Sequence, residues 1–344
     1  MTKTLLSVVI AIYLLNVELM AEIFRADSLE HTGSNVSVSD TSHVPDSLFT
    51  FAGVPRITID GSIPLQVTKL RLIPSAITVA ALAATLVSVH TSQQHAWWSG
   101  QRQAFHFTED WGSALQVDKF GHAFGAYSMS YVFSEVYLVS GFNVDDADFY
   151  GSITGGLYQT YVETEDGHAR DWGFSPSDWY FDALGATYFL AQHYIPFLQN
   201  FTPKWQYVPS EWVGKPIISR QRTFVDDYNS STFWLSVNMH NLLDGKAKEL
   251  WPAWLNLAVG YGGDKIDFTP DPTGPPDQLS QRRYIVGLDV CFDQIIPKNG
   301  AVSNWWLQTF RYIKFPGPAI EFSPGRTKVY LLYPFRLNLG FAIL

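Results

Sequence analysis

The feature that most constrains this chain is a set of ionisable residues inside apolar, glycine-rich segments between residues 118 and 185. Residues 118–122 read Asp-Lys-Phe-Gly-His, residues 163–166 read Glu-Thr-Glu-Asp, and residues 175–185 carry two aspartates before a glycine. Charged groups surrounded by Trp, Tyr, Phe and Leu side chains are costly to desolvate unless they are paired or bind a ligand. This stretch is therefore the first place to expect a functional site.

Several of these residues are spaced four apart, so each pair lies on one face of a helix. The pairs are Asp118 with His122, Gln159 with Glu163, and Asp178 with Asp182. If the three polar stripes converge, they surround one small volume. Such a group fits a divalent cation, either a hard metal such as Mg, Mn or Ca, or Zn with enough histidine. It also fits a general acid and base with separated pKa values.

The residues of this region have distinct expected roles. Glu163 or His122 is the candidate catalytic base, and Lys119, His168 and Arg170 are the candidate contacts to an anionic head group. The candidate metal ligands are Asp118, His122, Glu163, Asp166, Asp178 and Asp182.

The alternative to a ligand site is a buried polar network that pins the helices together. In that interpretation Asp178 serves the first turn of its helix, where a negative charge is favoured, and Glu163 pairs with Arg170. His193, at a distance from the motifs, is interpreted as an ordinary packing or surface residue, as are two other isolated histidines, His106 and His240.

The composition fits a membrane-facing protein and excludes one class of partner. Charged residues make up 16% of the chain and aromatic residues 15%, a balance that suits contact with a membrane. The net charge of −9 argues against a large nucleic-acid contact surface, which needs clustered Lys and Arg. Because Cys291 is the single cysteine, the chain forms no internal disulfide and no cysteine-based zinc site.

The first 21 residues have the form of a signal peptide, with Lys3 ahead of an apolar core at 5–15 and Ala21 at the expected cleavage position. The alternative is an uncleaved membrane anchor. No cysteine follows this segment, so a lipoprotein anchor is not expected at that point.

A second apolar segment, residues 72–90, has 19 residues without a formal charge. That length is enough to cross a bilayer, but a buried central helix explains it equally well. Lys69 and Arg71 precede the segment, and the positive-inside rule would place them in the cytoplasm, in conflict with a leading signal peptide. Whether the segment crosses a membrane stays open at this level.

Three further helices are expected, over 120–139, 151–163 and 178–195, with an acidic turn at 143–148 between the first two. Ser177 is the expected N-cap of the last helix. Gly151 and Gly155 have the GxxxG spacing that permits close approach of two helices.

After Pro203 the apolar pattern changes to period two, which indicates four or five β-strands. Their apolar face is expected to meet the helices or a membrane, because the smallest membrane barrels need about eight strands. Residues 265–281, with four prolines, are expected to form an irregular loop. The clearest strand patterns lie at 233–240, 255–262, 284–293 and 337–343.

The sequence therefore predicts an α+β fold, in which an N-terminal helical membrane-associated bundle is followed by a C-terminal antiparallel β-sheet. The expected parts are a signal peptide or anchor at 1–21, a polar segment at 22–68, a helical domain with the acidic and histidine motifs at 69–200, a linker at 201–228 and a β region at 229–344.

The motifs at 118–122, 163–166 and 175–185 resemble a family of bacterial envelope proteins, the YfiM-like predicted periplasmic lipoproteins. Blocks such as 255–262 also resemble longer members, so the resemblance covers about residues 69–333. A more distant likeness to VanZ-like membrane proteins, which share Asp-Lys-x-x-His, implies a helical membrane domain. The chain lacks the cysteine of the lipoprotein pattern, so attachment would come from the helices or the sheet. Neither resemblance implies a reaction or a cofactor.

The function expected from these observations is that of a bacterial cell-envelope membrane protein on the periplasmic side, in either membrane. It is expected to bind an envelope component, an anionic lipid or glycan bridged by a divalent cation, through the acidic and histidine cluster. One alternative is a metal-dependent hydrolase acting on such a lipid, although neither His-Glu-x-x-His nor Gly-x-Ser-x-Gly occurs. The other is a structural component of the outer membrane. The expected partner is the membrane, and no nucleic acid is expected.

Overall fold

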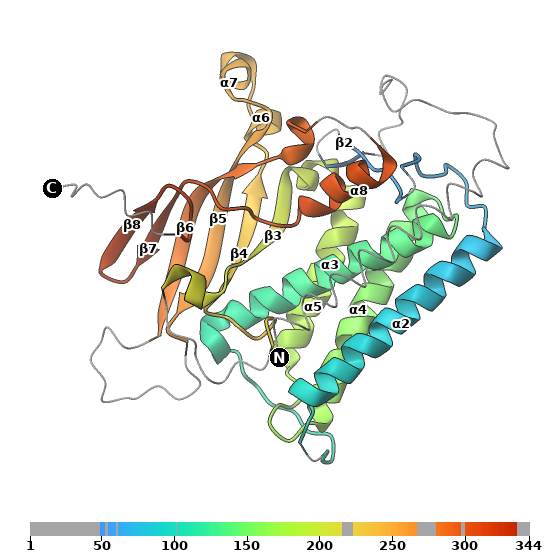
Figure 1. Ribbon diagram of the computed structural model, residues 1–344, viewed down its shortest axis with the longest axis vertical. Coiled ribbons are helices and arrows are strands. Elements are labelled where there is room, and N and C mark those ends of the chain that lie inside the picture. Colours follow the sequence, from blue (N-terminus) through green and yellow to red (C-terminus); the bar gives the residue numbers. More distant parts are fainter. Residues whose placement is uncertain are drawn as a thin grey trace. The chain divides into compact units, whose positions relative to one another are not determined.

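The computed structural model divides into two compact units, one mainly helical and one built on a β-sheet (Figure 1), and the predicted α+β class is confirmed. The helical unit comprises Met1–Thr108, Gly125–Gln199 and Ile296–Phe310, and the sheet unit comprises Glu109–Phe124, Asn200–Ile295 and Arg311–Leu344. The structure describes residues 49–51, 54–59, 61–100, 102–214, 223–266, 280–296 and 300–335.

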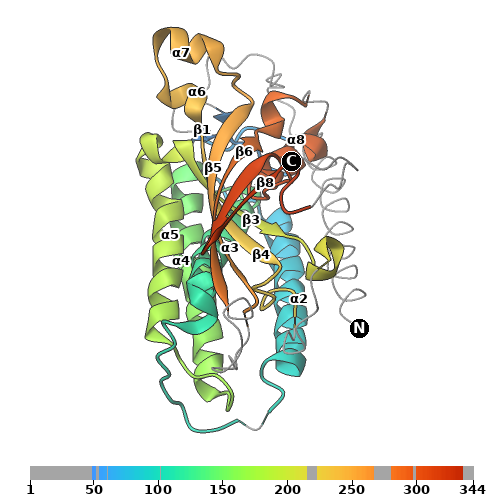
Figure 2. The same ribbon diagram turned by 90° about the vertical axis from the view of Figure 1, so that its left-hand side faces the viewer.

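The helical unit is dominated by long helices, of which α4 and α5 lie side by side (Figure 2). Its elements are β1 (Phe49–Phe51), β2 (Val54–Pro55), α2 (Leu72–Ala96), most of α3 (Val117–Val139), α4 (Val144–His168), α5 (Pro176–Tyr194), the short 3₁₀ helix η4 (Pro196–Asn200) and α8 (Ala301–Phe310).

Local capping fixes where α4 and α5 begin, and it corrects two expectations. The Asn143 side chain accepts a hydrogen bond from the backbone N–H of Asp146, so residues 143–148 start α4 and do not form a separate turn. At α5 the N-cap is Ser175, which accepts from the N–H of Asp178, and not Ser177. Pro176 then occupies the first turn, where its missing N–H costs nothing.

The expected close approach at Gly151 and Gly155 is confirmed. A methyl group added at Gly155 would lie 2.6 Å from the backbone nitrogen of Ser130 on α3, and one at Gly151 would lie 2.7 Å from Ser134. Both distances are shorter than any real carbon contact, so only glycine allows α3 and α4 to approach this closely.

Helix α2 contains the apolar run noted in the sequence and extends it to 25 residues. Of the helices that the structure describes, it is the one long and apolar enough to cross a membrane. Only 6% of its most apolar window is buried. This exposure does not fit a buried central helix, and a membrane crossing stays a prediction.

The sheet unit contains six antiparallel strands in the sequence order β3-β4-β5-β6-β7-β8 (Figure 1). The strands are β3 (Phe201–Tyr207), β4 (Ser231–Val237), β5 (Leu255–Asp264), β6 (Gln281–Val290), β7 (Ala319–Ser323) and β8 (Arg326–Tyr330). The short helices are η3 (Ser113–Gln116), η5 (Ser210–Val213), α6 (Met239–Leu242), α7 (Gly245–Leu250) and η7 (Phe292–Gln294).

Three of the four expected strands are found, as β4, β5 and β6, while the pattern at 337–343 lies outside the described residues. Strand β3 falls in the segment expected to be a linker. It contains Pro203, which argues against a central strand because proline has no N–H to donate, but which is tolerated at the edge of a sheet. Strands β7 and β8 have five residues each, too few for a clear alternation.

Candidate functional site

Three of the candidate ligands are carboxylates buried inside the helical unit. Glu163 lies near the end of α4, and Asp178 and Asp182 lie one turn apart near the start of α5. Their exposed fractions are 2%, 4% and 1%. A carboxylate oxygen of Glu163 lies within 4.8 Å of one of Asp182. Two acidic groups are therefore held close together away from bulk water.

Neighbouring polar groups orient these carboxylates. The backbone N–H of Ser175 donates to Oε2 of Glu163 at 3.2 Å, and the amide of Gln159 donates to Oδ1 of Asp182 at 3.4 Å. Since Ser175 also caps α5, the same residue ties the end of α4 to the start of α5. The expected stripes on these two helices thus face one another inside the unit.

The other acidic candidate of this unit has a different environment. The indole of Trp98 donates to Oδ1 of Asp166 at 2.6 Å, and the backbone carbonyl of Asp166 accepts from the N–H groups of Ala169 and Gly173. Asp166 therefore stabilises the turn that ends α4, together with Trp98.

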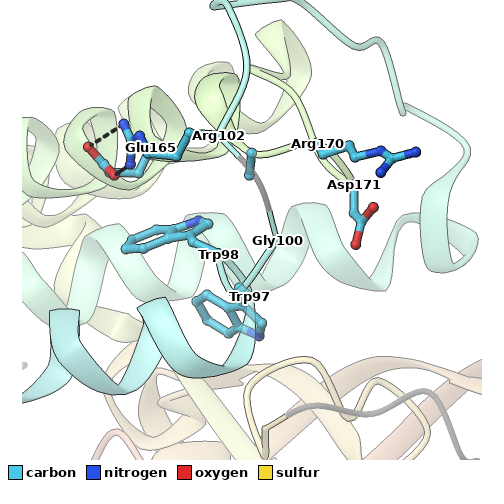
Figure 3. A pocket seen from close by; sticks show the side chains of 8 residues that line it. Trp97, Trp98, Gly100, Arg102, Glu165, Arg170 and Asp171 are labelled. Atoms are coloured by element: carbon cyan, nitrogen blue, oxygen red, sulfur yellow. Dashed lines mark hydrogen bonds and ion pairs between the residues drawn. The ribbon is translucent and has the colours of Figure 1, made fainter.

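A small pocket lies beside this turn (Figure 3). The Arg102 guanidinium donates to Glu165 at 2.5 Å on one side, and the exposed Arg170 side chain points away from Trp97 and Trp98 on the other. The cavity has a volume of about 10 Å³, which is the space that one water molecule needs. The pocket does not have room for a lipid or sugar. The third basic candidate is His168, whose Nδ1 atom lies 3.2 Å from the carbonyl oxygen of Gln103.

The sheet unit holds the remaining candidates around the first turn of α3. The Lys119 ammonium is fully buried and lies 2.5 Å from Asp110 and 3.1 Å from Asp118. The Tyr228 hydroxyl also donates to Asp118, and Nε2 of His122 lies 3.6 Å from the same carboxylate. Because Lys119 is enclosed between two carboxylates, this geometry does not favour a contact of Lys119 with an anionic head group.

These contacts set the ionisation of Asp118. Burial raises the pKa of the carboxyl. The charges of His122 and Lys119 and the hydrogen bonds from Tyr228 and Lys119 lower it by more than burial raises it, so the net pKa lies below the ordinary value. Asp118 is therefore an anion at neutral pH.

The structure brings the predicted residues together within each unit. Glu163 and Asp182 lie close together in the helical unit, with Asp178 one turn from Asp182 on α5, and Asp118 and His122 lie together in the sheet unit. The convergence of all five around one volume stays a prediction from the sequence.

A second buried polar network, in the helical unit, was not expected from the sequence. Arg56 is 1% exposed and lies between two acids, with Nη2 2.8 Å from Glu135 and Nη1 bonded to Asp148. The Trp305 indole donates to Glu135 at 2.8 Å. The sequence did contain one indication of this network, because Glu135 is a lone carboxylate in an apolar helix and a buried charge needs a partner. Its partner lies 79 residues away, where local patterns give no indication.

His193 belongs to this network, so its interpretation as an isolated histidine was wrong. Nε2 lies 2.8 Å from Asp145, and Nδ1 lies 3.0 Å from Asp148. Burial lowers the pKa of His193, but hydrogen bonds and charges from Asp148 and Asp145 outweigh it and raise the net pKa. The pKa of Asp148 is lowered, because Arg56 and His193 overcome the effect of burial.

One segment of the chain is similar to a family of known proteins. Residues 106–192 match the model of a family described as "Predicted periplasmic lipoprotein (DUF2279)". The matched segment contains every candidate ligand from Asp118 to Asp182. No match was found among curated proteins or among solved structures. The match of residues 106–192 to the family model supports a periplasmic lipoprotein of unknown function. It also confirms the predicted location, which is membrane-associated and on the periplasmic side of the cell envelope. The YfiM-like and VanZ-like likenesses stay resemblances.

Proposed function

We propose that the helical unit binds a divalent cation through Glu163, Asp178 and Asp182, and that this cation holds an anionic lipid or glycan of the envelope. The observation that carries the proposal is the separation of less than 4.8 Å between carboxylate oxygens of Glu163 and Asp182, both almost completely buried. Asp178 lies one turn from Asp182 on the same helix.

Electrostatics favours a cation between these groups. Two carboxylates this close in a medium of low dielectric constant repel each other, and a bound cation or a shared proton relieves the repulsion. Oxygen ligands lie about 2.0–2.6 Å from Mg²⁺ or Ca²⁺, so two oxygens within 4.8 Å of each other are within reach of one ion.

The surrounding hydrogen bonds support the same function. Ser175 and Gln159 each bond one oxygen of a carboxylate, which fixes the orientation of that group, as neighbouring hydrogen bonds do for metal ligands. A hard cation held by carboxylates keeps coordination positions for further oxygen ligands, and phosphate or carboxylate oxygens of an anionic envelope component are suitable ligands. Hydrolysis of such a lipid stays an alternative prediction from the sequence.

The experiment is elemental analysis of full-length protein purified from membranes, with Asp182→Asn and Glu163→Gln measured beside it. We expect about one divalent metal ion per chain in the wild type and loss of that ion in both variants. Asp171→Asn is the matched control, because it removes an exposed carboxylate of the same unit. It should keep the metal.

Metal-free wild-type protein, combined with a lower unfolding temperature of Asp182→Asn, would contradict the proposal and identify a polar network that pins the helices. Asp118→Asn and His122→Gln, measured in the same way, test the wider ligand set predicted from the sequence. Release of product from an envelope phospholipid by the metal-bound protein, and not by Asp182→Asn, would support the hydrolase instead of the binding protein.

A further inference from the structure

One face of the sheet is apolar, and on strands β5 to β8 much of it is exposed. At β4 the start of α3 packs on the same face, against Phe233. Successive side chains of a strand point to opposite faces, and on β5 to β8 the residues of one face are almost all large and apolar. Val329 is 79% exposed and Tyr284 is 54% exposed. The other exposed members are Val259, Val286, Ile320 and Phe322. We name these six residues the outer face.

The strand register arranges this face in rows. Leu235, Val259, Val286, Ile320 and Val329 are direct neighbours on consecutive strands, so one row of aliphatic side chains crosses five strands. On β5 and β6 the aliphatic surface continues for two more rows, through Leu257 with Leu288 and through Leu255 with Val290.

At one end of the sheet this aliphatic surface is bordered by an aromatic row. Tyr261, Tyr284 and Phe322 are neighbours on β5, β6 and β7. Arg282 follows at the next outer position of β6. Its side chain is exposed. The order from the centre outward is therefore aliphatic, aromatic and basic.

Aromatic side chains also border the opposite end. Trp254 immediately precedes β5 and is 41% exposed. Its carbonyl accepts from the N–H of Cys291, and the next residue, Phe292, packs edge-on against Phe315 with ring centres 4.8 Å apart. Tyr284 and Phe292 are eight residues apart, which corresponds to about 27 Å of extended chain.

The opposite face of the sheet is buried, and there charged residues lie beside an apolar cluster that includes Trp234 and Ile285. The Lys204 ammonium lies 2.6 Å from Asp289, and Arg283 donates to the Tyr333 hydroxyl at 2.7 Å. Glu321, 2% exposed, lies 2.9 Å from the Lys328 ammonium. A sheet in water places apolar side chains inside and polar ones outside. This sheet instead buries several charged residues on one face and exposes apolar side chains on the other, and exposed apolar side chains are typical of strands solvated by lipid.

We propose that the outer face lies in a phospholipid bilayer, with its aliphatic side chains against the acyl chains. Tyr284 and Phe322 then lie at the level of the head groups, where aromatic rings are favoured, and Arg282 meets lipid phosphates. Measured along the strand, the two aromatic borders are about 27 Å apart, a length comparable with the apolar band of membrane-embedded strands, which is about 25 Å tall. This inference is independent of the cation site, because it uses other residues of another unit.

The experiment places an environment-sensitive fluorophore on the outer face of the full-length protein. Cys291→Ser removes the single native thiol, and Val286→Cys then carries an NBD label at the centre of the aliphatic row. The matched control carries the label at Lys246→Cys, an exposed position of α7 away from the strands. Each protein is reconstituted into vesicles of phosphatidylcholine with phosphatidylglycerol, with or without bromine on the acyl chains.

At position 286 we expect a blue shift of NBD emission in vesicles and quenching by brominated acyl chains, and at position 246 neither change. Because the label reports its own surroundings, membrane attachment through another part of the chain does not produce this signal at position 286. Emission at position 286 that stays water-like and unquenched in vesicles would overturn the proposal. Shielding of position 286 without lipid, together with cross-linking of two unlabelled Val286→Cys copies through the introduced thiol, would also overturn it and identify a second copy of the chain as the occupant.

Discussion

At the scale of single residues, several buried charges in each unit lie within a few ångströms of opposite charges. Arg56 bonds Glu135 and Asp148 in the helical unit, and Lys204 bonds Asp289 in the sheet unit. Such pairs contribute little net stability, because desolvation offsets their attraction, but removing one partner leaves a charge buried without compensation. The variants below test these pairs.

Asp289→Asn should lower the free energy of unfolding by about 3–5 kcal/mol, because the variant removes the acid that neutralises Lys204. Lys314 lies 3.8 Å from the same carboxylate, and burial, opposed by Asp289, lowers the pKa of Lys314 to about 8. Denaturant titration of the detergent-solubilised protein measures the effect. Asp244→Asn, at an exposed carboxylate, should change stability by less than about 0.5 kcal/mol. Equal effects of the two variants would refute the role of Asp289.

His193 should make stability depend on pH near neutrality. Its pKa is raised in the folded protein above the ordinary 6.5, so the protonated form stabilises the fold. That contribution is fully present below pH 6.5 and is lost as the pH rises through the folded pKa. Thermal unfolding measured from pH 6 to pH 9 should show a decline in the wild type and a smaller decline in His193→Gln. Parallel curves for the two proteins would show that His193 does not titrate in this way.

At the scale of elements, much of the helical pattern could be predicted from the sequence and the long-range pairs could not. The spacing of Gly151 and Gly155 correctly predicted a close helix contact. The cap of α5 was misplaced by two residues, since Ser175 and Ser177 both flank Pro176 and either fits the motif. Strand β3 was missed because of Pro203, which its edge position tolerates. Each of these errors concerns a choice that tertiary context decides.

Two neighbouring glycines of α4 test the helix contact. Gly155→Ala should destabilise the protein by about 1–3 kcal/mol, because its methyl group would overlap the backbone of Ser130. Gly156→Ala is the matched control, since its methyl group would meet Ala186 at an ordinary 3.5 Å. That variant should keep the wild-type stability or gain up to about 1 kcal/mol from better helix propensity. Differential scanning calorimetry compares the two, and a stable Gly155→Ala would mean that α3 and α4 are not in close contact.

At the scale of the whole molecule, the sequence predicted the class of the fold, the envelope location and the region of the candidate site. It indicated the alternation of the strands but not which of their faces is buried, because the register across six strands decides which side chains become neighbours. It indicated the acidic motifs, but it missed Arg56, whose partners Glu135 and Asp148 are 79 and 92 residues away. Local periodicity carries no information about such pairs.

The Arg56 network also limits how far the helical unit can be shortened. Residues 106–192, the part that matches a known family, include Glu135 and Asp148 but neither Arg56 nor Trp305 nor His193. Produced by itself, that segment would have to bury two acids after losing the groups that neutralise and solvate them. The stretch recognisable by its motifs is thus smaller than the stretch that folds, and the chain on both sides of it supplies the missing counter-charge.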